Sequence, residues 1–275
     1  MLQSIEHQSG LPIAFDPVAN AIHWPGGTAA GSTSIRTAAE MRDYIRESDA
    51  TATQEATYIV YRTVARREDA ARIAGVNLRY DMTVIPPGHF SGTRREFFRT
   101  AGHYHPLVPN SAVAYPEVYE VISGRAYWLL QRRAEGNSAA LDAVYLVEAG
   151  PGEKAVMLPG FGHISINARP EPLIMANWIS NTFTYDYEPF RRFHGGGYWM
   201  LEGEMPAMVE FEPNHSYERL PELVKLRPRE IPALGLFRSR PLYGLAQNLE
   251  TLRFLNDPES FVDLLTVDTC YREVV

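Results

Sequence analysis

Short apolar runs separated by turn signals fill the middle of the chain, from about residue 78 to residue 182. Each run is rich in Val, Ile, Tyr, Phe or Trp, and Gly, Pro or Asn occupies most of the gaps, which is typical of strands. Regularly spaced short strands without long helices between them predict a β-sandwich or barrel. The candidate strands are YDMTVI, EFFRTAGHYH, EVYEVISG, RAYWLLQRR, AVYLVEAG, KAVMLPG, HISIN and PLIMANWI.

The N-terminal segment lacks this pattern. We interpret residues 1–75 as an arm of helices and irregular structure that packs on the barrel. In TAAEMRDYI, Thr37 and Glu40 have the spacing of a capping box, which predicts a helix start. REDAARIAGV is a second helix candidate, which ends at Gly75.

The C-terminal segment has many prolines and few clear strands. MPAMVEFEP is a possible strand, and DPESFVDLLTV predicts a helix with Asp257 as N-cap and Pro258 at its first position. We therefore expect three regions: the arm over 1–75, a barrel that carries the functional site over 76–195, and an extension over 196–275. The extension either belongs to the same domain or builds a dimer interface.

Composition and charge narrow the class of protein. The chain has 275 residues, 45% of them hydrophobic, which is normal for a globular protein. A formal charge of −7 argues against a nucleic-acid binder. No apolar run reaches the length of a membrane span, and the N-terminus lacks the features of a secretory signal, so we expect a cytoplasmic protein with no membrane partner. Cys270 is the only cysteine, so any metal site must use nitrogen and oxygen ligands.

Three histidines and a glutamate stand out among the strands. His103 and His105 are two residues apart, so on a strand they project to one face, which in a barrel is the interior. Glu117 lies in an otherwise apolar strand with Tyr119 on its face, and His163 follows a Pro-Gly turn. A buried histidine is usually a hydrogen-bonded core residue, and an H-x-H pair alone is a weak signal. The four together predict a site for Fe(II), Mn(II), Ni(II) or Zn(II) with positions left open.

The order of these residues resembles the two motifs of the cupin superfamily. Within it, the chain looks most like the cupin-type, archaeal-type glucose-6-phosphate isomerases, over roughly residues 58 to 195. This resemblance implies a mainly β fold, the double-stranded β-helix or jelly-roll barrel, here with an N-terminal helical arm and a C-terminal extension. The matching stretches are RYDMTVIPPG (79–88), TAGHYH (100–105), YPEVYEVISGRAYWLLQ (115–131), LPGFGHISIN (158–167) and YDYEP (185–189).

The resemblance also implies roles for individual residues. The catalytic candidates are Glu117, as the base that moves a proton between C1 and C2, and Tyr119. One divalent ion per chain is implied, Fe(II) first and Mn, Ni or Zn next, in a homodimer that acts in glycolysis and gluconeogenesis. The implied metal ligands are His103, His105, Glu117 and His163, and the implied substrate-binding residues are Thr83, Thr100, Gly102 and Tyr187, with Tyr119 and Tyr187 lining the sugar pocket.

Three departures from the family pattern bear on the substrate. Ala101 stands where we expect a lysine, which removes a cation beside the implied phosphate site, and Tyr185 replaces a histidine. The stretch between Gly88 and Thr100 is longer and brings in Arg94 and Arg95, either of which is a candidate to replace that cation.

Four functions are consistent with these residues. The leading interpretation is a metal-dependent aldose–ketose isomerase that interconverts glucose 6-phosphate and fructose 6-phosphate. A related isomerase or epimerase for another sugar or sugar phosphate is the first alternative. An iron-dependent cupin oxygenase and a sugar-binding or regulatory cupin with a structural metal are the others.

Overall fold

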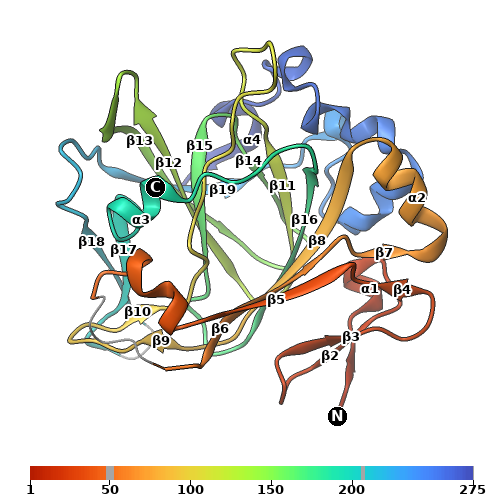
Figure 1. Ribbon diagram of the computed structural model, residues 1–275, viewed down its shortest axis with the longest axis horizontal. Coiled ribbons are helices and arrows are strands. Elements are labelled where there is room, and N and C mark those ends of the chain that lie inside the picture. The colour runs from red at the N-terminus through yellow and green to blue at the C-terminus, as the bar shows by residue number, and fades with distance from the viewer. Residues whose placement is uncertain (48–52, 206–207, 275) are drawn as a thin grey trace.

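Two facing sheets form the body of the molecule (Figure 1). The computed structural model describes residues 1–47, 53–205 and 208–274. The first sheet has the order β14-β11-β16-β8-β6-β5, and the second has the order β15-β12-β13-β19-β20. The strands of the two sheets are β5 (Ser32–Thr37), β6 (Ala56–Arg62), β8 (Leu78–Ile85), β11 (Glu117–Ser123), β12 (Ala126–Ala134), β13 (Asn137–Ala149), β14 (Lys154–Met157), β15 (Phe161–Ile166), β16 (Leu173–Ser180), β19 (Leu223–Pro228) and β20 (Tyr271–Glu273).

The order in which the chain visits the sheets is that of a jelly roll. After β8 in the first sheet, the segment 99–103 pairs with β15 in the second. The chain then returns to the first sheet for β11, crosses for β12 and β13, returns for β14, crosses for β15 and ends in β16. This alternation gives two four-stranded layers, β8-β16-β11-β14 and 99–103-β15-β12-β13, which is the double-sheet arrangement expected of a jelly roll. The mainly β, jelly-roll prediction is confirmed.

The arm differs from its prediction, because its described residues form seven strands in addition to helices. ATYIVYR forms β6, where side chains at alternate positions face the interior, and β6 pairs antiparallel with both β8 and β5. Figure 1 shows β5 and β6 continuing the sheet beyond β8. Of the arm, β5 and β6 are therefore part of the first sheet. The smaller elements of the arm are β1 (Gln3–Ser4), α1 (Glu6–Ser9), β2 (Ala14–Asp16), β3 (Ala21–His23), β4 (Thr28–Ala29) and β7 (Ala65–Arg66). Of these, β1-β2-β3 and β4-β7 form small sheets of their own.

Both segments of the arm that were predicted to be helices form helical structure. The capping box forms, since the Thr37 amide donates to Glu40 Oε2 (2.8 Å) and the Glu40 amide donates to Thr37 Oγ1 (3.3 Å). It starts a 3₁₀ helix, η1 (Ala39–Tyr44), rather than an α-helix. The second candidate is α2 (Arg67–Gly75), which ends at the predicted glycine.

The C-terminal segment covers the outside of the sheets. The indole of Trp178 in β16 donates to Leu242 O (2.9 Å), and the Tyr271 hydroxyl donates to Val156 O in β14. The predicted helix after Asp257 is a 3₁₀ turn, and of MPAMVEFEP the part at 206–207 lies outside the described residues. No helix in the described ranges has both the length and the apolarity to cross a bilayer. The remaining elements are β9 (His89–Phe90), β10 (Glu96–Phe97), α3 (Glu188–Arg192), β17 (Tyr198–Glu202), β18 (Val209–Pro213), η3 (Pro232–Leu234), η4 (Leu242–Gln247), η5 (Leu249–Leu255), η6 (Pro258–Phe261) and α4 (Val267–Cys270).

Candidate metal centre and pocket

Four side chains meet where the two sheets face each other. Glu117 is the first residue of β11, and His163 lies on β15. His103 is held beside His163 by two backbone hydrogen bonds of 3.2 and 3.1 Å between the two residues. Glu117 Oε2 lies 3.3, 3.5 and 3.9 Å from Nε2 of His163, His105 and His103 respectively. The structure thus brings all four predicted ligands together, with one ligand atom from each within 4.8 Å of the others.

Three polar atoms of this cluster lack the partners that buried atoms normally have. Glu117 Oε2 and both ring nitrogens of His163 are buried without a hydrogen-bond partner in the described chain, whereas Glu117 Oε1 accepts from Asn177 Nδ2 (2.5 Å). An unpaired buried polar atom costs about 1–3 kcal/mol, more if it is charged. His105 Nδ1 lies 2.9 Å from the Tyr115 carbonyl, which fixes the tautomer with the Nε2 lone pair toward the centre. A divalent cation at this centre would satisfy Glu117 Oε2 and His163 Nε2.

Burial keeps the three imidazoles in the neutral form that binds metals. It lowers the pKa of His163 to about 3 and that of His105 to about 4, and holds the pKa of His103 well below its usual value. The rings are therefore neutral near pH 7, with lone pairs available. Burial raises the pKa of Glu117 to about 7, because a carboxylate without a cation is disfavoured there. Three neutral imidazoles and one carboxylate suit Fe, Mn, Ni or Zn in the divalent state.

A cavity of about 210 Å³ opens beside the cluster. Its floor is the inner face of the first sheet, where the register places Tyr119, Asn177 and Asp81 side by side on β11, β16 and β8. The implied catalytic and substrate-binding residues all line it: Thr83, Thr100, Gly102, Tyr119, Tyr187 and Glu117.

Gly102 is required by the local backbone. Its φ is +82°, and a Cβ there would lie 2.6 Å from Ile164 Cγ1 and 3.0 Å from the Phe190 ring. This glycine also interrupts the strand predicted over EFFRTAGHYH, of which only Glu96–Phe97 is regular strand. The break turns His103 and His105 so that their Nε2 atoms lie 3.1 Å apart, facing the same centre.

Comparison with known proteins agrees with this geometry. The model of the glucose-6-phosphate isomerase (GPI) family matches residues 35–215. The chain belongs to this family. It is 31% identical over 111 residues to a glucose-6-phosphate isomerase of Thermococcus onnurineus (strain NA1), a match that covers 40% of this chain and 51% of that one. The chain thus spans about half the length of this curated relative.

Several solved structures are similar to parts of this chain. An oxalate oxidase structure matches with a TM-score of 0.33 and 16% identity, over 47% of this chain and 54% of the other. Oxalate decarboxylase of Lactobacillus farciminis with formate matches with a TM-score of 0.33 and 17% identity, over 47% and 30%. A Cupin_2 domain of an XRE-family transcriptional regulator from Enterobacter cloacae has a TM-score of 0.27 and 12% identity, over 44% and 94%.

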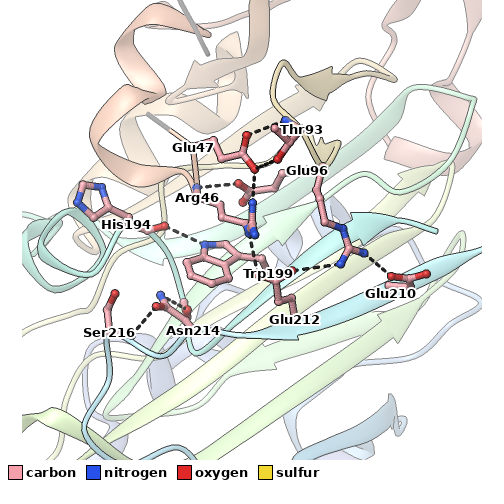
Figure 2. Close-up of polar contacts among 12 residues, drawn as sticks. Arg46, Glu47, Thr93, Glu96, His194, Trp199, Glu210, Glu212, Asn214 and Ser216 are labelled. Atoms are coloured by element: carbon pink, nitrogen blue, oxygen red, sulfur yellow. Dashed lines mark hydrogen bonds and ion pairs between the residues drawn. The ribbon is translucent and has the colours of Figure 1, made fainter. Parts of the chain in front are cut away.

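The arginines that follow Gly88 do not serve the pocket of this family member, so that prediction is wrong. Arg94 pairs with Glu210 and, at 3.2 Å, with Glu212, and both glutamates are labelled in Figure 2. Arg95 pairs with Glu202 at 2.7 Å. Both cations are neutralised among β9, β10, β17 and β18, away from the residues that line the cavity.

Tyr185, which replaces a histidine of the family pattern, lies inside the pocket. Its ring centroid is 4.1 Å from that of His103, and its hydroxyl accepts a hydrogen bond from Arg79. Arg79 also donates to Asp81 at 2.9 Å, so this arginine is neutralised where it stands. The substitution therefore adds a fixed phenol to the wall beside the metal ligands.

Several pocket residues escaped the sequence analysis. Asn177 lies 60 residues after Glu117, to which it donates a hydrogen bond. No local sequence pattern identifies it as a pocket residue. Arg36 and Arg62 lie in the arm, which the sequence analysis took to be outside the barrel. No regular alternation marks them, because five of the six residues in STSIRT are polar and Arg62 ends the largely apolar ATYIVYR.

Proposed function

We propose that the protein is a metal-dependent aldose–ketose isomerase that interconverts glucose 6-phosphate and fructose 6-phosphate. The observation that carries this proposal is the position of Glu117. Its carboxylate has one oxygen held by Asn177 and the other free, facing the histidine cluster at the end of a polar cavity. Family membership supports the same reaction.

The reaction is a net proton transfer from C2 to C1 of the sugar, with a second proton moving from O2 to O1. We assign the carbon-bound proton to Glu117, because a pKa near 7 allows a carboxylate to accept and return a proton at neutral pH. Tyr119 lies two residues further on the same face of β11, where its hydroxyl lowers the pKa of this carboxyl and is assigned the role of orienting it. A bound divalent metal would supply Lewis-acid stabilisation of the charge that develops on the C1 and C2 oxygens.

Four finer points are part of the same proposal. Iron is the expected native metal, ahead of Mn, Ni and Zn, and the expected role is in glycolysis and gluconeogenesis in the cytoplasm. We also propose a homodimer. The edge strand β5 supports it, because Ile35 is exposed on a six-residue strand that pairs on one side with β6, and such an edge can pair with a second copy. Light scattering should then give twice the chain mass of 31.0 kDa.

The test of the isomerase proposal is turnover in both directions. Metal-free protein would be supplied separately with Fe(II), Mn(II), Ni(II) or Zn(II) and assayed with glucose 6-phosphate, fructose 6-phosphate and a panel of other sugar phosphates. We expect the first two to be the best substrates, with the same rate under argon as in air, since no step consumes oxygen. Absence of turnover with all four metals would refute the isomerase, and a rate that required oxygen would indicate an oxygenase.

A further inference from the structure

The pocket needs positive charge if it is to bind a phosphorylated sugar. Ala101 is buried and supplies none, and Arg94 and Arg95 pair with carboxylates elsewhere. Arg79 reaches the cavity region but is engaged by Asp81 at 2.9 Å. Two other arginines line the cavity, Arg36 and Arg62, and both come from the arm.

The sheet register places these two arginines on the same face as the predicted phosphate contacts. Arg36 lies opposite Tyr58, and Val60 lies opposite Thr83, in one continuous antiparallel ladder. Side chains at i and i+2 share a face, and neighbouring strands are about 4.8 Å apart. Arg36 and Arg62 therefore project from β5 and β6 over the same wall of the cavity as Thr83.

The Tyr58 hydroxyl connects Arg36 to the opposite wall. Burial raises the pKa of Tyr58, and both the Arg36 guanidinium and the Ala101 amide oppose this rise, so the hydroxyl lies close enough to interact with both groups. Arg36 is thereby held next to the backbone between Thr100 and Gly102. An anion at this point would meet the guanidinium from one side and backbone and hydroxyl groups from the other.

The charges of these two arginines are available to a ligand. Among the described residues, neither guanidinium has a carboxylate within ion-pair distance: Arg62 donates to the Ser34 hydroxyl at 2.7 Å, and Arg36 contacts Tyr58. Glu40 also lines the cavity and its charge acts on Arg36, but its carboxylate accepts hydrogen bonds from the Thr37 amide and hydroxyl at the start of η1. The field of both arginines reaches the pocket, where it opposes the burial that raises the pKa of Tyr187 to about 12.

We propose that Arg36 and Arg62 form the cationic half of a phosphate subsite, opposite Thr83, Thr100 and Gly102, and that they select phosphorylated over free sugars. This inference rests on the proposed function, in that the substrate's other end lies at the metal centre. It replaces the cation missing at position 101 with two cations from another part of the chain. Guanidinium groups suit this role because they bind phosphate oxygens through paired N–H donors.

The test compares Arg36→Gln and Arg62→Gln with a matched control, Arg67→Gln, which removes an exposed arginine of the same arm outside the cavity. Each pocket variant should raise KM for glucose 6-phosphate at least tenfold, with kcat within about twofold, because a charged hydrogen bond made in both ground and transition states is lost. Arg36→Lys should recover part of the affinity. The control should match the wild type, and circular dichroism would confirm that all variants fold.

Inorganic phosphate provides a readout independent of turnover. Its Kd, measured by calorimetry, should rise at least tenfold in both pocket variants and stay unchanged in Arg67→Gln. If the wild type turns over glucose 6-phosphate but the pocket variants keep its KM, the subsite is refuted and the isomerase stands. If the wild type shows no turnover but binds phosphate through these arginines, the isomerase is refuted and the subsite stands. A wild type that does not bind phosphate at all also overturns the subsite.

Discussion

Two buried glutamates on β11 differ in whether their oxygens have partners. Glu117 and Glu120 are each about 1% exposed, and burial raises the pKa of each to about 7. They point to opposite faces of the sheet. Glu120 has both oxygens occupied, by Lys154 Nζ at 2.7 Å and by the Leu242 amide at 2.7 Å. Glu117 has one oxygen held by Asn177 and one without a hydrogen-bond partner in the described chain.

The difference shows that burial and a raised pKa do not by themselves mark a catalytic group. Both carboxylates share these properties, and only the free binding capacity of Glu117, with three neutral imidazoles around it, indicates chemistry. Glu120 fastens the C-terminal extension to the barrel, since Lys154 also donates to Arg240 O at 2.6 Å. The inner face of the sheet is thus arranged for a ligand and the outer face for stability.

The largest expected difference between the two faces of the sheet is the effect of a substitution on turnover. Glu117→Gln should lower kcat by about 10³-fold or more, because the general base is removed and the metal loses its anionic ligand. The thermal midpoint of the metal-free protein should not fall, since a buried carboxyl without an ion-pair partner is replaced by a neutral amide. Steady-state kinetics and metal analysis of the same sample would check both points. A variant with full turnover would show that Glu117 is neither base nor essential ligand.

The matching change on the outer face should act on stability instead. Glu120→Gln leaves Lys154 buried without its counter-charge, so the free energy of unfolding should fall by about 3 kcal/mol. Urea denaturation measures this, while kcat/KM at 25 °C should stay within about twofold of the wild type. The double variant Glu120→Gln/Lys154→Met should recover part of the loss. If the single variant lost activity but not stability, the assignment of the two faces would be reversed.

The pH dependence of metal binding should distinguish the two carboxyls again. Protons compete with the metal at Glu117, so affinity should fall up to tenfold per unit as pH drops below about 7, and level off above it. The histidines add no slope above pH 5, because burial lowers the pKa of His105 to about 4 and of His163 to about 3. Calorimetric titration should show the slope abolished in Glu117→Gln. The slope should persist in Glu120→Gln, although this variant also removes a buried carboxyl with a pKa of about 7.

The smallest expected effect is at the residue that orients the base. Tyr119→Phe removes the hydroxyl that acts on Glu117, so kcat should fall about tenfold with metal content unchanged. Because that hydroxyl lowers the pKa of Glu117, the acidic limb of the kcat–pH profile should also move to higher pH. An unchanged profile would mean that the Tyr119 hydroxyl does not act on the base.

The metal ligands could be predicted from the sequence because each carries a local signal. His103 and His105 share a short segment, Glu117 interrupts an apolar strand, and His163 follows a turn. The strands of the arm could not be predicted from the sequence, because STSIRT is polar and forms a strand only by pairing with residues 56–62. The arginines of the pocket were missed for the same reason.

The ion-pair partners of Arg94 could likewise not be predicted from the sequence. Its partners Glu210 and Glu212 lie more than a hundred residues further along, on β18, and only the folded sheet brings them together. The sequence shows that Arg94 and Arg95 lie between Gly88 and Thr100, but it does not show which carboxylates they contact. Non-local pairing therefore decides which arginine reaches the ligand.

The central claim is that Glu117 and its three histidines hold a divalent metal that isomerase activity requires. The most direct test is to assay one preparation for glucose 6-phosphate isomerisation as purified, after chelation, and after Fe(II) or Mn(II) is restored, with metal content measured at each stage. We predict about one ion per chain, loss of turnover with the metal, and recovery on its return. Undiminished turnover in protein that has been stripped of metal would contradict the claim.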